Sequence, residues 1–241
     1  MNEYQNQFKD LSIVGKDKSL VATESRRFLL NVYNWMAMGL ALTGLIAYGV
    51  STSTTIMRLI YSNPFLFWGI LILQLVIVIA LSAAINKMPA ILAIGAFFFY
   101  AAVTGISLSI LFLVYTQASI AYTFFICAAM FGSVSVFGYI TKMNLSGVGT
   151  FMYMGLIGLI IASVVNIFLK SEGLYFIISY VGVIIFVGLT AWDTQKLKQM
   201  SQSISFESEQ GKKAAVMGAL MLYLDFINMF LFLLRIMGSR K

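Results

Sequence analysis

The feature that most constrains this chain is a series of long apolar segments that recurs along almost its whole length. Seven such segments are separated by short polar connections, with approximate limits 29–50, 64–85, 90–114, 118–140, 148–169, 174–195 and 214–236. Each has about 20 residues, the length that an α-helix needs to cross the hydrocarbon core of a bilayer. None alternates between apolar and polar residues as a membrane β-barrel strand does. The sequence therefore predicts an all-α, polytopic membrane protein with seven transmembrane helices.

The composition agrees with this fold and narrows the function. Hydrophobic residues make up 60% of the chain and charged residues 10%, against about 25% charged residues in soluble domains. The chain has no histidine, which excludes Ser-His catalysis and histidine-ligated haem or zinc. The seventh segment has lysines only at its start, so it offers no mid-helix Schiff base for retinal. We therefore predict neither an enzyme nor a protein with a bound cofactor. The single cysteine, Cys127, is expected to be a small core or lipid-facing residue.

The basic residues indicate the orientation in the membrane. With the polar tail of residues 1–28 inside and a transmembrane domain at 29–237, eleven of the sixteen basic residues lie on the inner side. These are Lys9, Lys16, Lys18, Arg26, Arg27, Lys87, Lys142, Lys196, Lys198, Lys212 and Lys213. Because they are scattered over segment ends, they do not indicate nucleic-acid binding. Since Arg235, Arg240 and Lys241 would move inside if the last segment were re-entrant, the charges leave open whether it spans.

Two acidic residues, Asp193 and Asp225, fall within long apolar segments, and all the others lie in polar tails or loops. A carboxylate near the bilayer centre costs a few kcal/mol, so a proton or ion site is the default explanation. Two structural alternatives stay open. Asp193 could cap the end of its helix at the interface, and Asp225 could make a buried hydrogen bond.

The predicted topology brings both aspartates toward the inner side, where their carboxyl groups could meet. Two carboxylates in contact in a low-dielectric site cannot both ionise cheaply, so the pair would titrate as a unit that shares one proton. Such a pair would sense pH without a histidine. When fully deprotonated it would offer oxygen ligands for Ca²⁺, although two carboxylates alone are few ligands.

The seventh segment also carries a polar stripe. Asp225, Asn228, Phe232 and Arg235 fall within about 80° of one another on a helix, which predicts that this face turns toward the bundle interior. Asn228 could donate a hydrogen bond to Asp225 one turn away. Arg235 is too far along the helix to pair with Asp225 and is expected at the outer interface.

The segments TAWDTQKLK and LYLDFINMFLFLLRI closely resemble the signature of the Bax inhibitor-1 (transmembrane BAX inhibitor motif) family, in its prokaryotic, YccA-like branch. The resemblance implies a central last helix, wrapped by the other six in two layers of three. It also implies a pH-sensitive aspartate pair, matched here by Asp193 and Asp225. Relatives are described as Ca²⁺ leak channels, eukaryotic members suppress cell death, and some bacterial members modulate a membrane-anchored AAA protease. A location in the bacterial inner membrane, with a cytoplasmic N-terminus, follows as an expectation.

One departure from the family concerns the end of the second helix. Some relatives carry an arginine cluster there that latches onto the aspartate pair, whereas this chain has SAAINKMPA with only Lys87. A lysine does not reproduce the two-pronged hydrogen bonding of arginine. Two functions follow as hypotheses: a pH-sensitive channel for Ca²⁺ or another cation, and a non-conducting regulator that binds a membrane-anchored AAA protease or another membrane partner.

Overall fold

The computed structural model describes the backbone of residues 2–241 and the side chains of residues 23–241, and every regular element in them is a helix. The helices are α1 (Asn2–Thr52), α2 (Thr54–Tyr61), α3 (Pro64–Ala84), α4 (Ala90–Leu108), α5 (Leu111–Val114), α6 (Gln117–Ile140), α7 (Ser146–Leu169), α8 (Glu172–Ser201) and α9 (Glu209–Met237). Seven helical segments are long and apolar enough to cross a membrane, and each overlaps one predicted segment. The predicted all-α, seven-helix fold is therefore confirmed.

Side-chain caps fix where several helices begin. The Asn63 side chain accepts a hydrogen bond from the Phe65 N–H, and Pro64 at the first helical position needs no partner for a missing N–H. Ser171 and Ser208 cap α8 and α9 in the same way. These caps satisfy N–H groups that a helix start leaves unpaired, at points where the chain reverses direction.

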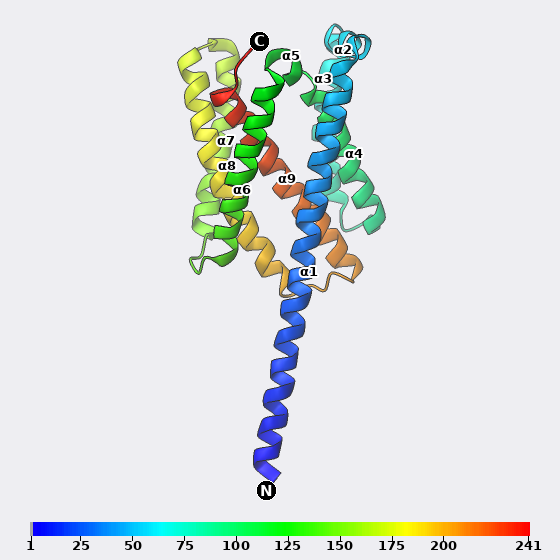
Figure 1. The fold of residues 1–241 in the computed structure, drawn as a ribbon, viewed down its shortest axis with the longest axis vertical. Helices are drawn as coiled ribbons and strands as arrows, with labels where there is room; N and C mark the ends of the chain where they lie inside the picture. Colours follow the sequence, from blue (N-terminus) through cyan, green and yellow to red (C-terminus); the bar gives the residue numbers. More distant parts are fainter. Residues whose placement is uncertain (1) are drawn as a thin grey trace.

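The last helix is the centre of the bundle. In the most apolar stretch of α9, 72% of the residues are buried, against 6% in α3 and in α7. Helices α1, α3 and α4 form one group and α6, α7 and α8 another, and α9 runs diagonally between them (Figure 1). This arrangement matches the layout that the family resemblance implies. It leaves the outer faces of α3 and α7 exposed, as lipid contact requires.

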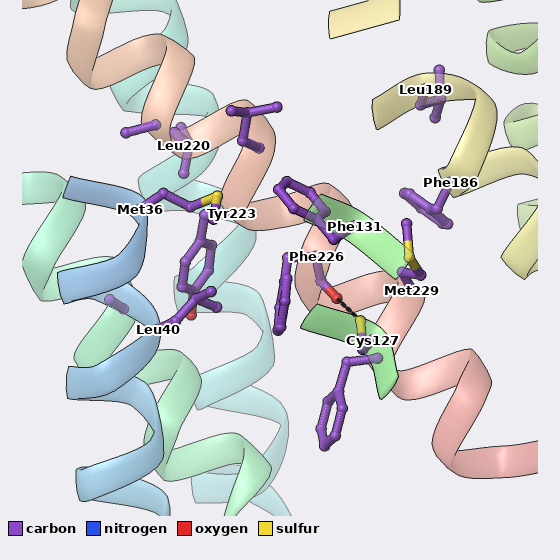
Figure 2. Packing of buried hydrophobic residues seen from close by; sticks show 14 of the residues in the cluster. Met36, Leu40, Cys127, Phe131, Phe186, Leu189, Leu220, Tyr223, Phe226 and Met229 are labelled. Carbon is purple, nitrogen blue, oxygen red and sulfur yellow. Dashed lines mark hydrogen bonds between the residues drawn. The ribbon is translucent and has the colours of Figure 1, made fainter. Parts of the chain in front are cut away.

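The two sides of α9 differ in chemistry. On one side, the fully buried Tyr223 hydroxyl hydrogen-bonds the Thr43 hydroxyl of α1 at 2.7 Å, and Figure 2 shows its ring beside Met36 and Leu40. On the other side, Asp225 faces α8, because two residues along a helix correspond to a rotation of about 200°. A single helix thus carries both the aromatic core and the candidate site.

Cys127 is a core residue, one of the two predicted alternatives. Its side chain is 0% exposed, and its thiol donates to the Phe226 carbonyl of α9 at 3.7 Å (Figure 2). The contact joins α6 to the central helix.

The polar connection between the sixth and seventh apolar segments, at 196–213 in the sequence, is shorter in the structure. Helix α8 continues to Ser201 and α9 already begins at Glu209, so that only residues 202–208 connect them. The helical extension is stabilised by packing, since Leu197 is 0% exposed and lies against Gly218 of α9. The Glu209 carboxylate accepts a hydrogen bond from the Ala90 N–H at 2.5 Å, which ties the start of α9 to the start of α4.

The structure also resolves the open question about the last segment. Helix α9 is continuous over 29 residues and runs from the end of the bundle where α8 stops to the opposite end (Figure 1). The re-entrant alternative is therefore wrong. The predicted tail, residues 1–28, lies mostly outside the described side chains, and its separation from a domain at 29–237 stays a prediction.

Candidate functional site

Asp193 and Asp225 are both buried between α8 and α9. Their side chains are 9% and 5% exposed. Asp193 lies about two turns before the end of α8, whereas Asp225 lies about 24 Å along α9, near its middle. Since α8 continues well past Asp193, this residue does not cap a helix end.

The carboxyl groups of Asp193 and Asp225 lie close enough for each to act on the charge of the other. Two ionised carboxylates can only accept hydrogen bonds, so a bond between them requires one proton. Among the described residues, the Oδ2 atom of Asp225 is buried without a hydrogen-bond partner. This leaves one of the two carboxyl oxygens of Asp225 unsatisfied, and the alternative of a structural buried hydrogen bond stays open for the other oxygen.

Two neighbours on α8 complete the polar surroundings of the pair. Thr190 lies beside Asp225, and its hydroxyl donates to the Phe186 carbonyl at 2.7 Å. Lys196 is the positive charge that acts on Asp193, and its ammonium lies 5.4 Å from the centre of the Trp192 ring. Because Lys196 is exposed, it only partly compensates the buried carboxylates.

A cavity of about 940 Å³ lies against the pair, between α7, α8 and α9. Most of its lining is apolar, and Asp193, Lys196, Asp225 and Asn228 are among its few polar groups. The Trp192 ring packs directly on Gly149 of α7. Apolar walls with a few convergent polar groups are typical of binding sites.

Asn228, Lys87 and Arg235 lie in three different parts of the structure. Asn228 lines the cavity, but its amide donates to the Leu224 carbonyl at 2.8 Å, so the predicted donation to Asp225 is not seen. The i−4 carbonyl of its own helix is the nearer acceptor. Lys87 is exposed in the turn between α3 and α4 and does not line the cavity. Arg235 lies at the far end of α9, stacked 5.4 Å from the Tyr175 ring centre, away from the pair as predicted.

Sequence reasoning missed the parts of the site that depend on packing. Trp192 lies near the end of the sixth apolar segment, a position typical of an interfacial aromatic belt, and in the structure it lines the cavity. Thr190 precedes Asp193 by three residues, and this one-turn spacing could have identified it.

The pair has the chemistry to hold one proton or to contribute two ligands to a cation. No group of three or more acidic, cysteine or histidine side chains able to hold a metal occurs among the side chains of residues 23–241. Further ligands for a cation would have to be hydroxyl groups, carbonyl groups or water.

Comparison with known proteins places this geometry in context. Residues 25–241 match the family described as "Inhibitor of apoptosis-promoting Bax1". The chain is 49% identical over 215 residues to the "Inner membrane protein YbhL" of Escherichia coli (strain K12), covering 89% of this chain and 92% of that protein. It is 45% identical to a Rickettsia prowazekii protein, over 97% of this chain and 98% of the relative. A Borreliella burgdorferi protein is 44% identical over 89% and 93% of the two chains.

Proposed function

Because the chain belongs to the Bax1-I family of integral membrane proteins, which confirms the resemblance in its sequence, we propose that it is a pH-sensitive cation leak channel for Ca²⁺, gated by Asp193 and Asp225. We further propose that it resides in the bacterial inner membrane with a cytoplasmic N-terminus, in line with the name of the Escherichia coli relative, an inner membrane protein, and with the charge distribution. In this proposal the protein is not an enzyme and uses no cofactor. Ca²⁺ is its cargo.

The observation that carries the proposal is the buried Asp225 carboxyl, with one unpartnered oxygen, facing a second carboxyl beside a large cavity. Burying two negative charges together is costly, so the pair is stable while it shares a proton. Loss of this proton creates repulsion between α8 and α9 and at the same time a doubly anionic site. A cation entering the cavity relieves the repulsion, which couples proton occupancy to ion passage.

The local structure explains how a change at the pair reaches the rest of the bundle. Helix α8 connects to α1 through hydrogen bonds between the Thr194 and Tyr33 hydroxyls at 3.2 Å and between the Ser201 and Ser25 hydroxyls at 2.5 Å. Displacement of α8 would strain these contacts near its inner half. Without the arginine latch of some relatives, we propose that the shared proton and these contacts hold the closed state.

The test is Ca²⁺ flux into proteoliposomes measured across pH. Asp193→Asn and Asp225→Asn keep the side-chain volume but remove the second ionisable carboxyl, so each should change the pH profile of the flux. Glu207→Gln is the matched control, because it removes an exposed carboxylate outside the apolar segments and should leave the profile unchanged. Identical flux and pH profiles in the parent and both aspartate variants would rule the proposal out.

A second candidate function rests on α1, which extends away from the other helices at the end where α8 stops (Figure 1). In this alternative the protein conducts nothing and binds a membrane-anchored AAA protease, or another membrane partner, through its N-terminal region. Deletion of residues 2–22 keeps the contact between Ser25 and Ser201 and should abolish pull-down of the partner. Retained pull-down by the deletion variant would count against this region.

A further inference from the structure

Three basic side chains gather at the end of the bundle that carries the C-terminus. Lys170 at the end of α7, Arg235 in the last turn of α9 and Arg240 line one pocket of about 510 Å³, in which Glu172 is the single acidic residue. Two ion pairs occur among the side chains of residues 23–241, and both involve Arg27. Neither of them involves Lys170, Arg235 or Arg240. The protein thus holds like charges together without pairing them with its own carboxylates.

Aromatic rings fix the two guanidinium groups of this pocket. Arg235 lies 5.4 Å from the ring centre of Tyr175 and 5.2 Å from that of Phe232, and Arg240 lies 5.9 Å from Tyr175. The backbone of Arg240 is held by an antiparallel bridge to Tyr115. The Arg240 guanidinium also lies within reach of the Tyr115 and Tyr175 hydroxyl groups. A guanidinium has five N–H donors, so donors remain for the oxygens of a phosphate group.

The basic pocket borders the cavity beside the aspartates. Ser163 and Ile167 of α7 line both of them. From Ile167 the cavity follows α7 to Tyr153, which is about 21 Å along the helix, against about 15 Å for the hydrocarbon of one bilayer leaflet. Its walls along this path are mainly apolar, so the space suits a hydrocarbon chain.

We propose that this groove binds an anionic phospholipid. Its phosphate lies between Arg235, Arg240 and Lys170, and one acyl chain fills the cavity between α7 and α9 as far as Trp192. A lipid is favoured over free phosphate because the basic pocket adjoins an apolar space as long as an acyl chain. An anionic headgroup is favoured over a zwitterionic one because three cations face only Glu172. Since the same cavity is the proposed entry for a cation, the bound lipid belongs to the closed state with the shared proton, and its binding does not depend on ion conduction.

Trp192 gives a direct readout, because it lies at the far end of the cavity. The other two tryptophans, Trp35 and Trp68, are replaced by Phe, so that emission comes from Trp192 alone. Purified protein in detergent micelles is titrated with phosphatidylglycerol carrying brominated acyl chains, which quench a neighbouring indole. We expect half-maximal quenching at a roughly tenfold lower lipid fraction than with brominated phosphatidylcholine, as for one good charge-assisted contact.

The variant Arg235→Gln/Arg240→Gln should remove this preference while leaving quenching by phosphatidylcholine unchanged. Arg58→Gln is the matched control, because Arg58 lines a separate pocket at the same end of the bundle. If the double variant does not fold, Arg240→Gln alone serves, since Arg240 is exposed and its replacement should still weaken the preference severalfold. Unchanged Trp192 emission without lipid verifies the fold of each variant.

Three results would overturn the proposal. The first is equal quenching by the two brominated lipids in the parent protein. The second is an unchanged preference in the arginine variants. The third is protection of the protein against heat by inorganic phosphate, compared with chloride at equal ionic strength, without any preferential quenching by phosphatidylglycerol. That third result would identify a free-anion site instead of a lipid groove.

Discussion

Helices α6 and α8 approach each other so closely at Gly138 that a single methyl group should separate them. A Cβ atom at this position would overlap the backbone carbonyl of Ala191 on α8. Backbone atoms cannot rotate away as a flexible side chain can, so Gly138→Ala requires the two helices to move apart. Gly132 on the same helix has no atom within 4 Å of such a Cβ, which makes Gly132→Ala the matched control.

Gly132→Ala should stabilise the protein, and Gly138→Ala should destabilise it. Replacing Gly by Ala within a helix stabilises it by about 0.5–1 kcal/mol, and both variants gain this amount. Overpacking a close contact costs about 1–3 kcal/mol, and only Gly138→Ala incurs it. We therefore expect Gly132→Ala to be up to about 1 kcal/mol more stable than the parent, and Gly138→Ala up to about 2.5 kcal/mol less stable.

The chain contains its own reporter for this measurement. Cys127 is the single cysteine, is 0% exposed and lies on the same helix as both glycines. The rate at which a maleimide labels it in graded denaturing detergent reports the opening of the bundle. If the two variants differ by less than about 0.5 kcal/mol, the close approach of α6 and α8 does not exist as described. Since Asp193 follows Ala191 by two residues, Gly138→Ala should also alter the pH profile of Ca²⁺ flux.

Two further predictions concern polar contacts away from the aspartates. Tyr223→Phe removes the buried hydrogen bond to Thr43 and should lower the free energy of unfolding by about 1 kcal/mol. In a double-mutant cycle with Thr43→Val, the two losses of stability should be less than additive. Strict additivity would contradict the contact. Gln195→Ala leaves the Leu145 N–H without the Gln195 oxygen that accepts it at 2.8 Å, so the connection between α6 and α7 should exchange its amide hydrogens faster, at a cost of about 2–3 kcal/mol. The exposed Gln199→Ala is the control, and equal exchange in both variants would refute this role.

The sequence was sufficient to predict the helices, because the signal for each one is local. About 20 consecutive apolar residues have few alternatives in a bilayer, and the seven segments appear as helices at the expected places. The same argument identified Asp225, since the cost of burying a carboxylate rises with its depth in the membrane. The end of α8 was mispredicted because Lys196 and Lys198 indicate a loop, while the packing of Leu197 against Gly218 extends the helix.

Features that depend on how helices meet were not predictable in this way. No local signal distinguishes Gly138, which contacts backbone, from Gly132, which faces open space. The cavity beside the pair exists because α7 lies next to α8 and not against α9, which no single segment reveals. The Asn228 amide was assigned to Asp225 from its spacing, but a carbonyl of its own helix accepts the bond.

The central position of α9 has a consequence for biosynthesis. Because a chain is made from its N-terminus, the six surrounding helices leave the ribosome before the segment that forms their common core. Until Glu209–Met237 is inserted, α1, α4, α6 and α8 lack their contacts with α9, and Asp193 lies in the membrane without Asp225 beside it. Assembly therefore completes only after α9 has been inserted, and a chain truncated before α9 would lack the helix around which the other six pack.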